Sequence, residues 1–173
     1  MKRRDFISHT LLTSAALANG FAWADMPKVQ SLDDALLWLG KIDKAGNARS
    51  TGTWPLAAVM EHLAQSVEMS MDGFPKPNSA LFQHTAGSAA FAVFKWRGEM
   101  SHHLSEPIPG APVLTQAADW RPASARLRAA LSRFMQHQGP LKPHFAYGLL
   151  SKDNFARAHV MHIANHQDEI LIG

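Results

Sequence analysis

The apolar residues of this chain recur at the spacing of an α-helix, and this periodicity limits the fold more than any other feature of the sequence. Residues three and four apart share a helix face. Segment 31–45 carries one such apolar stripe, formed by Leu32, Ala35, Leu36, Leu39 and Ile42. Similar patterns occur in 53–73, 80–100 and 119–138, and in the segment after Ser151. Alternation long enough for a β-strand is not found, so the sequence predicts an all-α fold.

Capping and breaking residues mark the expected helix ends. Ser31, Thr53 and Ser151 are the predicted N-caps, because a hydroxyl oxygen can accept a hydrogen bond from a free backbone N–H of the first turn. Pro55 is expected in the first turn of its helix, where the missing N–H does no harm. Gly73 is expected to end the same helix.

Long connectors separate these helices. The segment 101–116 is rich in proline and reads as a surface loop, and 139–150 is a second connector. The length of 173 residues fits one domain. We therefore expect an antiparallel four-helix bundle with an extra short helix and long loops.

The first residues are organised like a twin-arginine signal peptide. Arg3 and Arg4 open the stretch "RRDFI", a mildly apolar run follows, and a small-x-small triplet ends at Ala24. We expect residues 1–24 to be removed and residues 25–173 to form a periplasmic domain. An uncleaved membrane anchor is the less favoured alternative, because polar residues interrupt the apolar run.

Charge and composition exclude several classes of function. The net charge of +3 falls to about +1 once the leader is removed, and no basic stripe remains. Nucleic acid is therefore not an expected partner, and neither is a membrane after signal cleavage. The chain has no cysteine, which excludes disulfides, a cysteine nucleophile and cysteine-based zinc sites.

Histidines gather on the face of the last helix that is expected to be buried. His159, His162 and His166 fall on one arc, together with Phe155 and Ile170. A buried imidazole needs partners for both of its ring nitrogens. From the residues alone, a hydrogen-bonded core and a metal site are about equally favoured.

The pair His162 and His166 has the i, i+4 spacing with which one helix can direct two imidazoles at one ion. Ile163 follows His162, so the glutamate of the HExxH metalloproteases is missing and their mechanism is excluded. A third ligand must come from another helix. His62 is the preferred candidate because it lies in the middle of an amphipathic helix, and His84 is the alternative.

Neighbouring residues leave further alternatives. His102 and His103 fall at a helix–loop junction and are expected to be solvated. Glu61 is expected to form a solvated salt bridge. Several methionines lie near the histidines and would suit a soft ion such as copper, but core packing is the favoured interpretation for them: Met60, Met69, Met71 and Met161.

With the stretches "EHLAQS", "PIPGAP", "PHFAYGLLS" and "HIANH", the chain from about Ser31 to Ile170 resembles the DinB-like (YfiT-like) helical-bundle superfamily. Within it, the chain is most similar to a subfamily of unknown function, domain-of-unknown-function family 1569. The resemblance implies a divalent metal (Zn, Ni, Fe or Mn) bound by His62, His162 and His166. Some members have a glutamine where this chain has Glu169.

Three imidazoles leave at least one coordination position of a metal open, as in catalytic sites. A metal-dependent hydrolase or transferase acting on a small molecule is the expected function, with Gln65, Ser66 and His159 as candidate catalytic residues. Characterised members of the superfamily include thiol-dependent transferases and isomerases. The alternative is a non-catalytic metal-binding or metal-storage module for Zn, Ni or Cu. A homodimer is left open.

Overall fold

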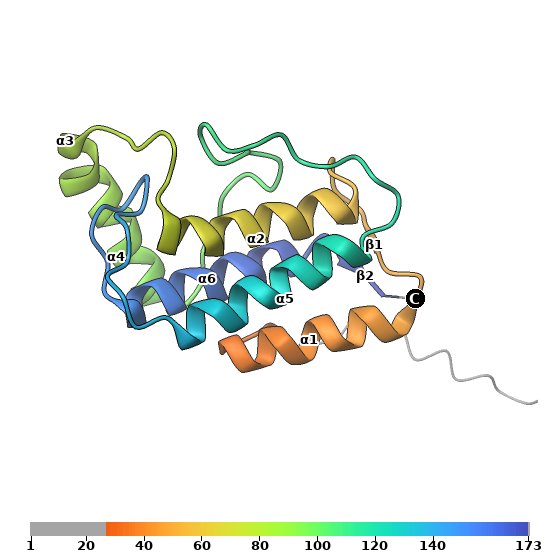
Figure 1. Ribbon diagram of the computed structural model, residues 1–173. Coiled ribbons are helices and arrows are strands. Elements are labelled where there is room, and N and C mark those ends of the chain that lie inside the picture. The colour runs from red at the N-terminus through yellow and green to blue at the C-terminus, as the bar shows by residue number, and fades with distance from the viewer. Residues whose placement is uncertain (1–26, 173) are drawn as a thin grey trace, which may run out of the picture.

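The computed structural model describes residues 27–172, and within them the chain is mostly helical (Figure 1). The helices are α1 (Leu32–Ala45), α2 (Leu56–Asp72), α3 (Ala80–Phe82), α4 (Ser88–Arg97), α5 (Arg121–Gln136) and α6 (Lys152–Gln167), with the π-helical turn η2 (Gln83–Gly87) between α3 and α4. The short strands β1 (Arg49–Ser50) and β2 (Ile170–Leu171) pair antiparallel. The predicted leader, residues 1–24, lies outside the described residues.

Two of the three predicted N-caps are confirmed. The hydroxyls of Ser31 and Ser151 each accept a hydrogen bond from the backbone N–H three residues further on. The prediction for Thr53 was wrong, because Pro55 occupies the N-cap position in an extended conformation. A residue that precedes proline is also held extended, so α2 cannot begin earlier. Gly73 ends α2 as predicted.

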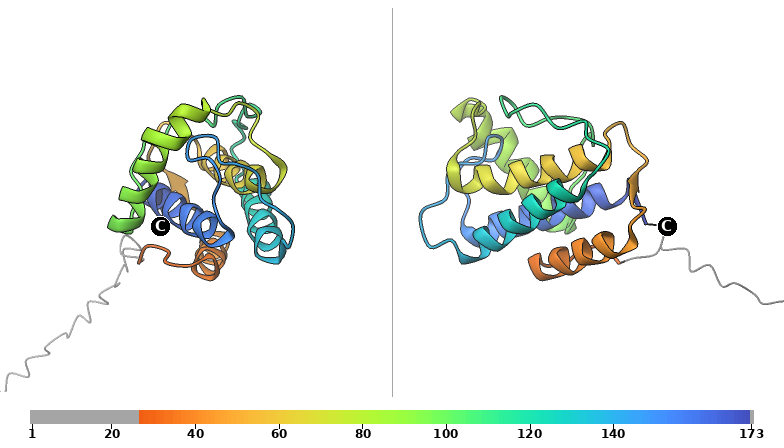
Figure 2. Two further views of the ribbon diagram at one scale, coloured as in Figure 1. Left: turned by 90° about the vertical axis from the view of Figure 1, so that its left-hand side faces the viewer. Right: turned by 45° about the vertical axis from the view of Figure 1, so that its right-hand side comes forward.

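One apolar core lies among α1, α2, α5 and α6, which run side by side in Figures 1 and 2. Every one of these helices contributes side chains that are fully removed from solvent, including Leu39, Leu63, Leu127, Phe134 and Phe155. Complete burial of such a side chain stabilises the fold by roughly 1.5–3 kcal/mol. The methionines Met60 and Met71 belong to this core, in line with the packing interpretation.

Ion pairs show that α2 and α5 run in the same direction. Arg126 of α5 binds Glu61 and Glu68 of α2. Arg133, about two turns later in α5, binds Asp72 at the end of α2. Partner positions therefore advance together along both helices. The expectation of an antiparallel arrangement was wrong for this pair. The connector 98–120 returns the chain along the molecule before α5 begins (Figure 1).

The helices α2 and α6, by contrast, run in opposite directions. His62, in the first half of α2, contacts His162 in the second half of α6, whereas Ser70, near the end of α2, contacts His159, which lies earlier in α6. This antiparallel contact brings the middle of α2 against the histidine-bearing face of α6.

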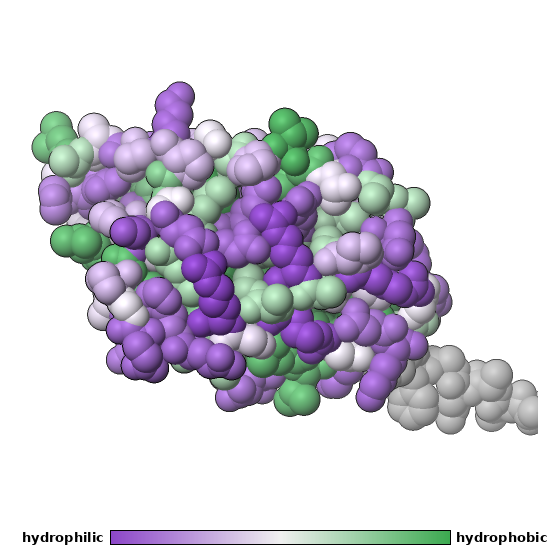
Figure 3. Space-filling model, viewed as in Figure 1, coloured by the Kyte–Doolittle hydropathy of each residue, from purple (hydrophilic) through white to green (hydrophobic). Residues whose placement is uncertain are grey.

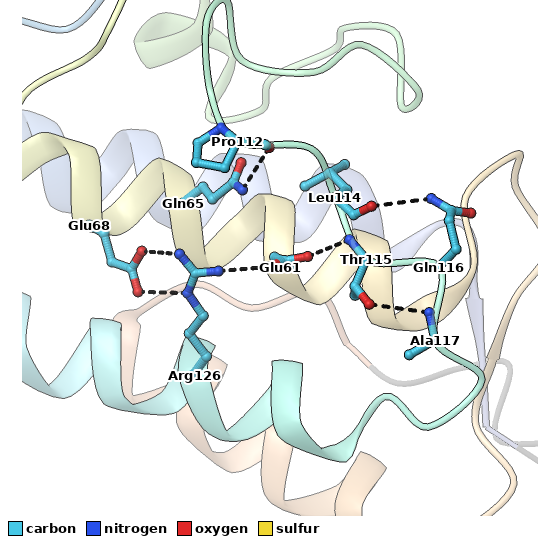
Figure 4. A network of polar contacts seen from close by, with 9 residues as sticks. All are labelled: Glu61, Gln65, Glu68, Pro112, Leu114, Thr115, Gln116, Ala117 and Arg126. Atoms are coloured by element: carbon cyan, nitrogen blue, oxygen red, sulfur yellow. Dashed lines mark hydrogen bonds and ion pairs between the residues drawn. The ribbon is translucent and has the colours of Figure 1, made fainter.

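The connector 98–120 is fixed to α2 by polar contacts (Figure 4). Glu61 accepts a hydrogen bond of 2.6 Å from the backbone N–H of Thr115, and Gln65 Nε2 donates to the carbonyl of Pro112 at 3.1 Å. Arg126 then joins Glu61 to Glu68. The salt bridge predicted for Glu61 is confirmed, but its carboxylate is half-buried rather than solvated, because it also anchors the connector.

A smaller apolar cluster attaches α4 to α6. It contains Phe91 of α4, Met100 of the connector, and Ala158 and Met161 of α6. On the face drawn in Figure 3, hydrophilic residues predominate and apolar residues form small scattered groups. Among the described helices, none has the length and apolar character needed to cross a membrane.

Candidate functional site

Three histidines converge where α2 packs on α6. The ring centroids of His62, His162 and His166 are separated by 5.0, 5.3 and 5.1 Å. One ring nitrogen of each lies within 4.8 Å of the others, and the Nε2 atoms of His62 and His162 are 3.1 Å apart. These histidines lie close together and could bind a metal ion. His84, the alternative to His62, is exposed on η2 and lies outside this group.

Burial keeps two of these imidazoles, His62 and His162, neutral. Desolvation lowers the pKa of His62 to about 3, and positive charge on His166 or His102 would lower it further. Burial also holds the pKa of His162 well below its usual range, with neighbouring histidines adding to the effect. A neutral imidazole keeps the lone pair that a metal requires. His62 and His162 are therefore in their metal-binding form at neutral pH.

Hydrogen bonds orient two of the three rings. The Nδ1 of His166 lies 2.6 Å from Glu169 Oε1. Since a carboxylate accepts, Nδ1 carries a proton, and in the neutral ring Nε2 keeps its lone pair. In the same way His162 Nδ1 contacts Ser66 Oγ at 3.3 Å. Histidines that bind metals commonly donate their second N–H to a carboxylate or another acceptor.

Two buried ring nitrogens of the group are without a hydrogen-bond partner among the described residues: His62 Nδ1 and His166 Nε2. A buried polar atom left unpaired costs roughly 1–3 kcal/mol. A hydrogen-bonded core would satisfy these atoms, whereas a metal ion would take up the lone pair at His166 Nε2. The residues present therefore fit a divalent metal with nitrogen ligands.

Glu169 is held by the two short strands. Its backbone carbonyl accepts from Thr51 N at 2.7 Å, and its side chain is 4% exposed. A Cβ atom at Gly52 would lie 1.8 Å from Glu169 Oε2, so a larger residue at this position would force the carboxylate to move. From the sequence, Glu169 was noted only as a departure from related chains. Its position three residues after His166 is the signal that could have identified it.

His102 is the main residue that the sequence interpretation misplaced. It was expected to be solvated, yet it is half-buried, and its ring centroid lies 4.9 Å from that of His162 and 5.6 Å from that of His166. Its Nδ1 donates to the carbonyl of His103 at 2.9 Å, which leaves a lone pair on Nε2. The connector places it there by folding back over α2 and α6. His103 is exposed, as expected.

A cavity of about 170 Å³ opens onto His62 and His162. Its walls come from α2, α6, the connector around 100–109 and the turn 144–147. Met100, Ile108 and Tyr147 supply apolar lining. The space exceeds the roughly 10–15 Å³ that one water molecule requires, so the cavity has room for a small molecule beside the histidines.

The three candidate catalytic residues lie in different places. Ser66 and His159 line the cavity. Gln65 does not, because it lies on the side of α2 that the connector covers, where it binds the Pro112 carbonyl (Figure 4). Its role in this structure is to hold the connector.

His159 and His144 are buried beyond the group of three. His159 Nε2 lies 3.3 Å from Ser70 Oγ, and the ring packs against Phe134 and Phe155. Burial lowers the pKa of His159 to about 3. Burial, reinforced by the nearby His159, lowers that of His144 to about 3 as well. Both rings are neutral in the folded protein.

These two histidines should make stability depend on pH. Each has a folded-state pKa of about 3 and an ordinary value of 6.5, so the unfolded chain takes up protons first as the pH falls. Stability is then full above about pH 6.5 and declines towards pH 3, by up to about 1.4 kcal/mol per pH unit for each ring. Denaturant unfolding with a chelator present, measured from pH 4 to 7, should give a smaller slope for His144→Gln than for the wild type. The exposed His103→Gln should keep the wild-type slope, and an unchanged slope for His144→Gln would contradict the prediction.

Gly52 and Gly40 allow a matched test of the Glu169 contact. A methyl group at Gly52 displaces the carboxylate that orients His166, and overpacking of this kind destabilises by roughly 1–3 kcal/mol. At Gly40, inside α1, a Cβ would meet nothing within 4 Å, and Gly→Ala there should stabilise by up to about 1 kcal/mol. Denaturant unfolding should thus show opposite signs for G52A and G40A. Equal stability of G52A and the wild type would mean that this close approach does not hold Glu169.

Comparison with known proteins assigns the chain to a family without a described activity. Residues 25–171 match the family described as "Protein of unknown function (DUF1569)". No curated protein matches the chain. No solved structure matches it either. Because the match spans most of the chain, this protein belongs to the DUF1569 family.

Proposed function

We propose that this protein is a metal-dependent hydrolase or transferase that acts on a small molecule. In this proposal His62, His162 and His166 hold a divalent ion (Zn, Ni, Fe or Mn). The observation that carries it is the cavity, which opens directly onto His62 and His162. A structural metal site would have no need of an adjoining space for a second molecule.

The chain's own residues have separable roles in this function. Glu169 and Ser66 orient His166 and His162 through their Nδ1 atoms. The connector, fixed to α2 by Gln65 and Glu61, closes one side of the cavity and limits the access of water. A divalent metal bound by the three histidines supplies Lewis acidity, which polarises a substrate or activates water.

We also propose that the DinB-like resemblance is genuine and that α1, α2, α5 and α6 are its four-helix bundle. Two features support this. These helices share one core, and the histidine of α2 meets the HxxxH pair of α6.

A non-catalytic carrier or storage module for Zn, Ni or Cu is the second candidate, and His102 favours it. Its Nε2 lone pair is free, and its ring lies beside those of His162 and His166. As a fourth imidazole it would close the coordination shell, which is typical of structural rather than catalytic sites.

The ligand set is tested by metal content. His62→Ala, His162→Ala and His166→Ala should each lose most bound metal after equilibrium dialysis, because each removes a ligand. Glu169→Gln should bind about ten- to a hundredfold more weakly, since it alters only the orienting hydrogen bond. His103→Ala is the exposed control and should bind as the wild type does. Retention of metal by His62→Ala together with its loss in His84→Ala would show that the third ligand was assigned to the wrong helix.

Cobalt substitution separates the enzyme from the carrier. In the enzyme, azide added to the Co²⁺-loaded wild type should change the visible spectrum, because a coordination position is open. In the carrier, azide should act only on His102→Ala. The second result would reject catalysis at this metal while keeping the metal site.

We further propose that the chain is exported to the periplasm by the twin-arginine route, with residues 1–24 as the signal. The paired Arg3 and Arg4 support this, and the family match begins at residue 25. Residues 1–30 fused to a reporter should direct export that Arg3→Lys with Arg4→Lys abolishes. Export of the double variant through the general secretory route at normal yield would contradict the proposal.

A further inference from the structure

The end of the cavity opposite the metal-binding group carries a fixed hydrogen-bond donor on His144. This ring is 8% exposed and stacks on Tyr147 with centroids 4.2 Å apart. Its Nδ1 accepts from two backbone N–H groups, those of Ala146 at 3.1 Å and Tyr147 at 3.3 Å. Because backbone N–H groups only donate, Nδ1 must be unprotonated and Nε2 must carry the hydrogen. Nε2 makes no hydrogen bond within the described residues, and it is accessible from the cavity that the ring lines.

The same reasoning gives His159 a free acceptor. Ser70 Oγ donates its single hydrogen to the carbonyl of Val67 at 2.7 Å. It must therefore accept from His159 Nε2, which lies 3.3 Å away. The hydrogen of the neutral ring is then on Nε2, and Nδ1 keeps a lone pair. His159 is 2% exposed and lines the cavity, and its Nδ1 is without a partner among the described residues.

We propose that His144 Nε2–H and His159 Nδ1 form a recognition subsite for an uncharged group that both donates and accepts a hydrogen bond, a carboxamide or a hydroxyl. The inference rests on the proposed function in one respect: in the enzyme, this subsite would hold the end of the substrate that lies away from the metal. The subsite itself consists of protein groups alone.

The turn that carries His144 is held rigidly. His144 and Gly148 exchange two backbone hydrogen bonds of 2.8 and 3.0 Å. A Cβ at Gly87 would lie 1.9 Å from the carbonyl oxygen of Ala146, so the absence of a side chain there lets the turn dock on the end of η2. A donor on such a support is already positioned before a ligand arrives.

The rest of the cavity selects against an anion and provides an apolar wall. Met100, Ile108 and Phe145 contribute apolar surface, and Glu106 adds a carboxylate to the wall. An anion would face this carboxylate and the lone pair of His159. A cation at the subsite would face the donor of His144, although Glu106 would attract it elsewhere in the cavity. The cavity thus suits a neutral molecule with an apolar body.

Nitrogen NMR of the histidine rings tests the assignment without a ligand. In chelated, ¹⁵N-labelled protein, His144 and His159 should both show the hydrogen on Nε2. Ser70→Ala should release His159 from this constraint and change its ring-nitrogen signals while leaving those of His144 unaltered. A hydrogen on Nδ1 of either ring in the wild type would overturn the proposal.

Three probes of equal size test the recognition. Benzamide donates and accepts, acetophenone only accepts, and benzoate is an anion. Titrations followed by NMR should show benzamide binding roughly three- to tenfold more tightly than acetophenone, the worth of one hydrogen bond, and benzoate binding most weakly. His159→Leu should abolish the preference for benzamide, and the exposed His84→Leu should retain it. Equal binding of the three probes by the wild type would overturn the proposal.

Measuring chelated and Zn²⁺-loaded protein in parallel separates this inference from the proposed function. Preference for benzamide in a protein that takes up no metal would support the subsite and reject the metal site. Metal uptake without any preference among the probes would reject the subsite and leave the metal site in place.

Discussion

The antiparallel contact between α2 and α6 is the interaction on which the rest of this structure depends. It places His62 against His162 and His166, and it places Ser70 against His159. Each of these imidazoles is thereby removed from water, and desolvation keeps His62, His159 and His162 neutral. The other elements can be understood as supports for this contact. Helix α5 completes the core beside α2, the connector seals the outer side of α2, and the two short strands carry Glu169 to the end of α6.

The parts of the fold that sequence periodicity could predict are those in which neighbouring residues decide the outcome. The apolar stripes located the helices, and Ser31 and Ser151 were correctly identified as caps, because a cap depends on a few adjacent residues. The direction of α5 relative to α2 could not be obtained this way. It depends on where a long connector runs, and the contacts that fix this connector join Gln65 and Glu61 to residues about fifty positions away.

The same distinction applies to the site. The i, i+4 spacing of His162 and His166 is a local signal, and the position of His62 inside an amphipathic helix was enough to select it over His84. His102 carried no comparable signal, since a histidine in a proline-rich loop is usually solvated. Glu169 was visible in the sequence, but its role required Gly52, whose missing side chain admits the carboxylate. A residue whose role depends on contact with a segment distant in sequence gives little signal in a single sequence.

The buried histidines around α6 bear on the question that the sequence left open, a hydrogen-bonded core or a metal site. One ring nitrogen of His159 hydrogen-bonds to Ser70, and one ring nitrogen of His144 accepts a hydrogen bond from the backbone of its turn. At His62 and His166 the fold buries nitrogens and leaves them unpaired. A core selected for stability alone would have no reason to keep both patterns in one cluster of buried histidines, because the unpaired atoms destabilise it. Unpaired polar groups of this kind persist where function requires them, and here they lie where three imidazoles meet.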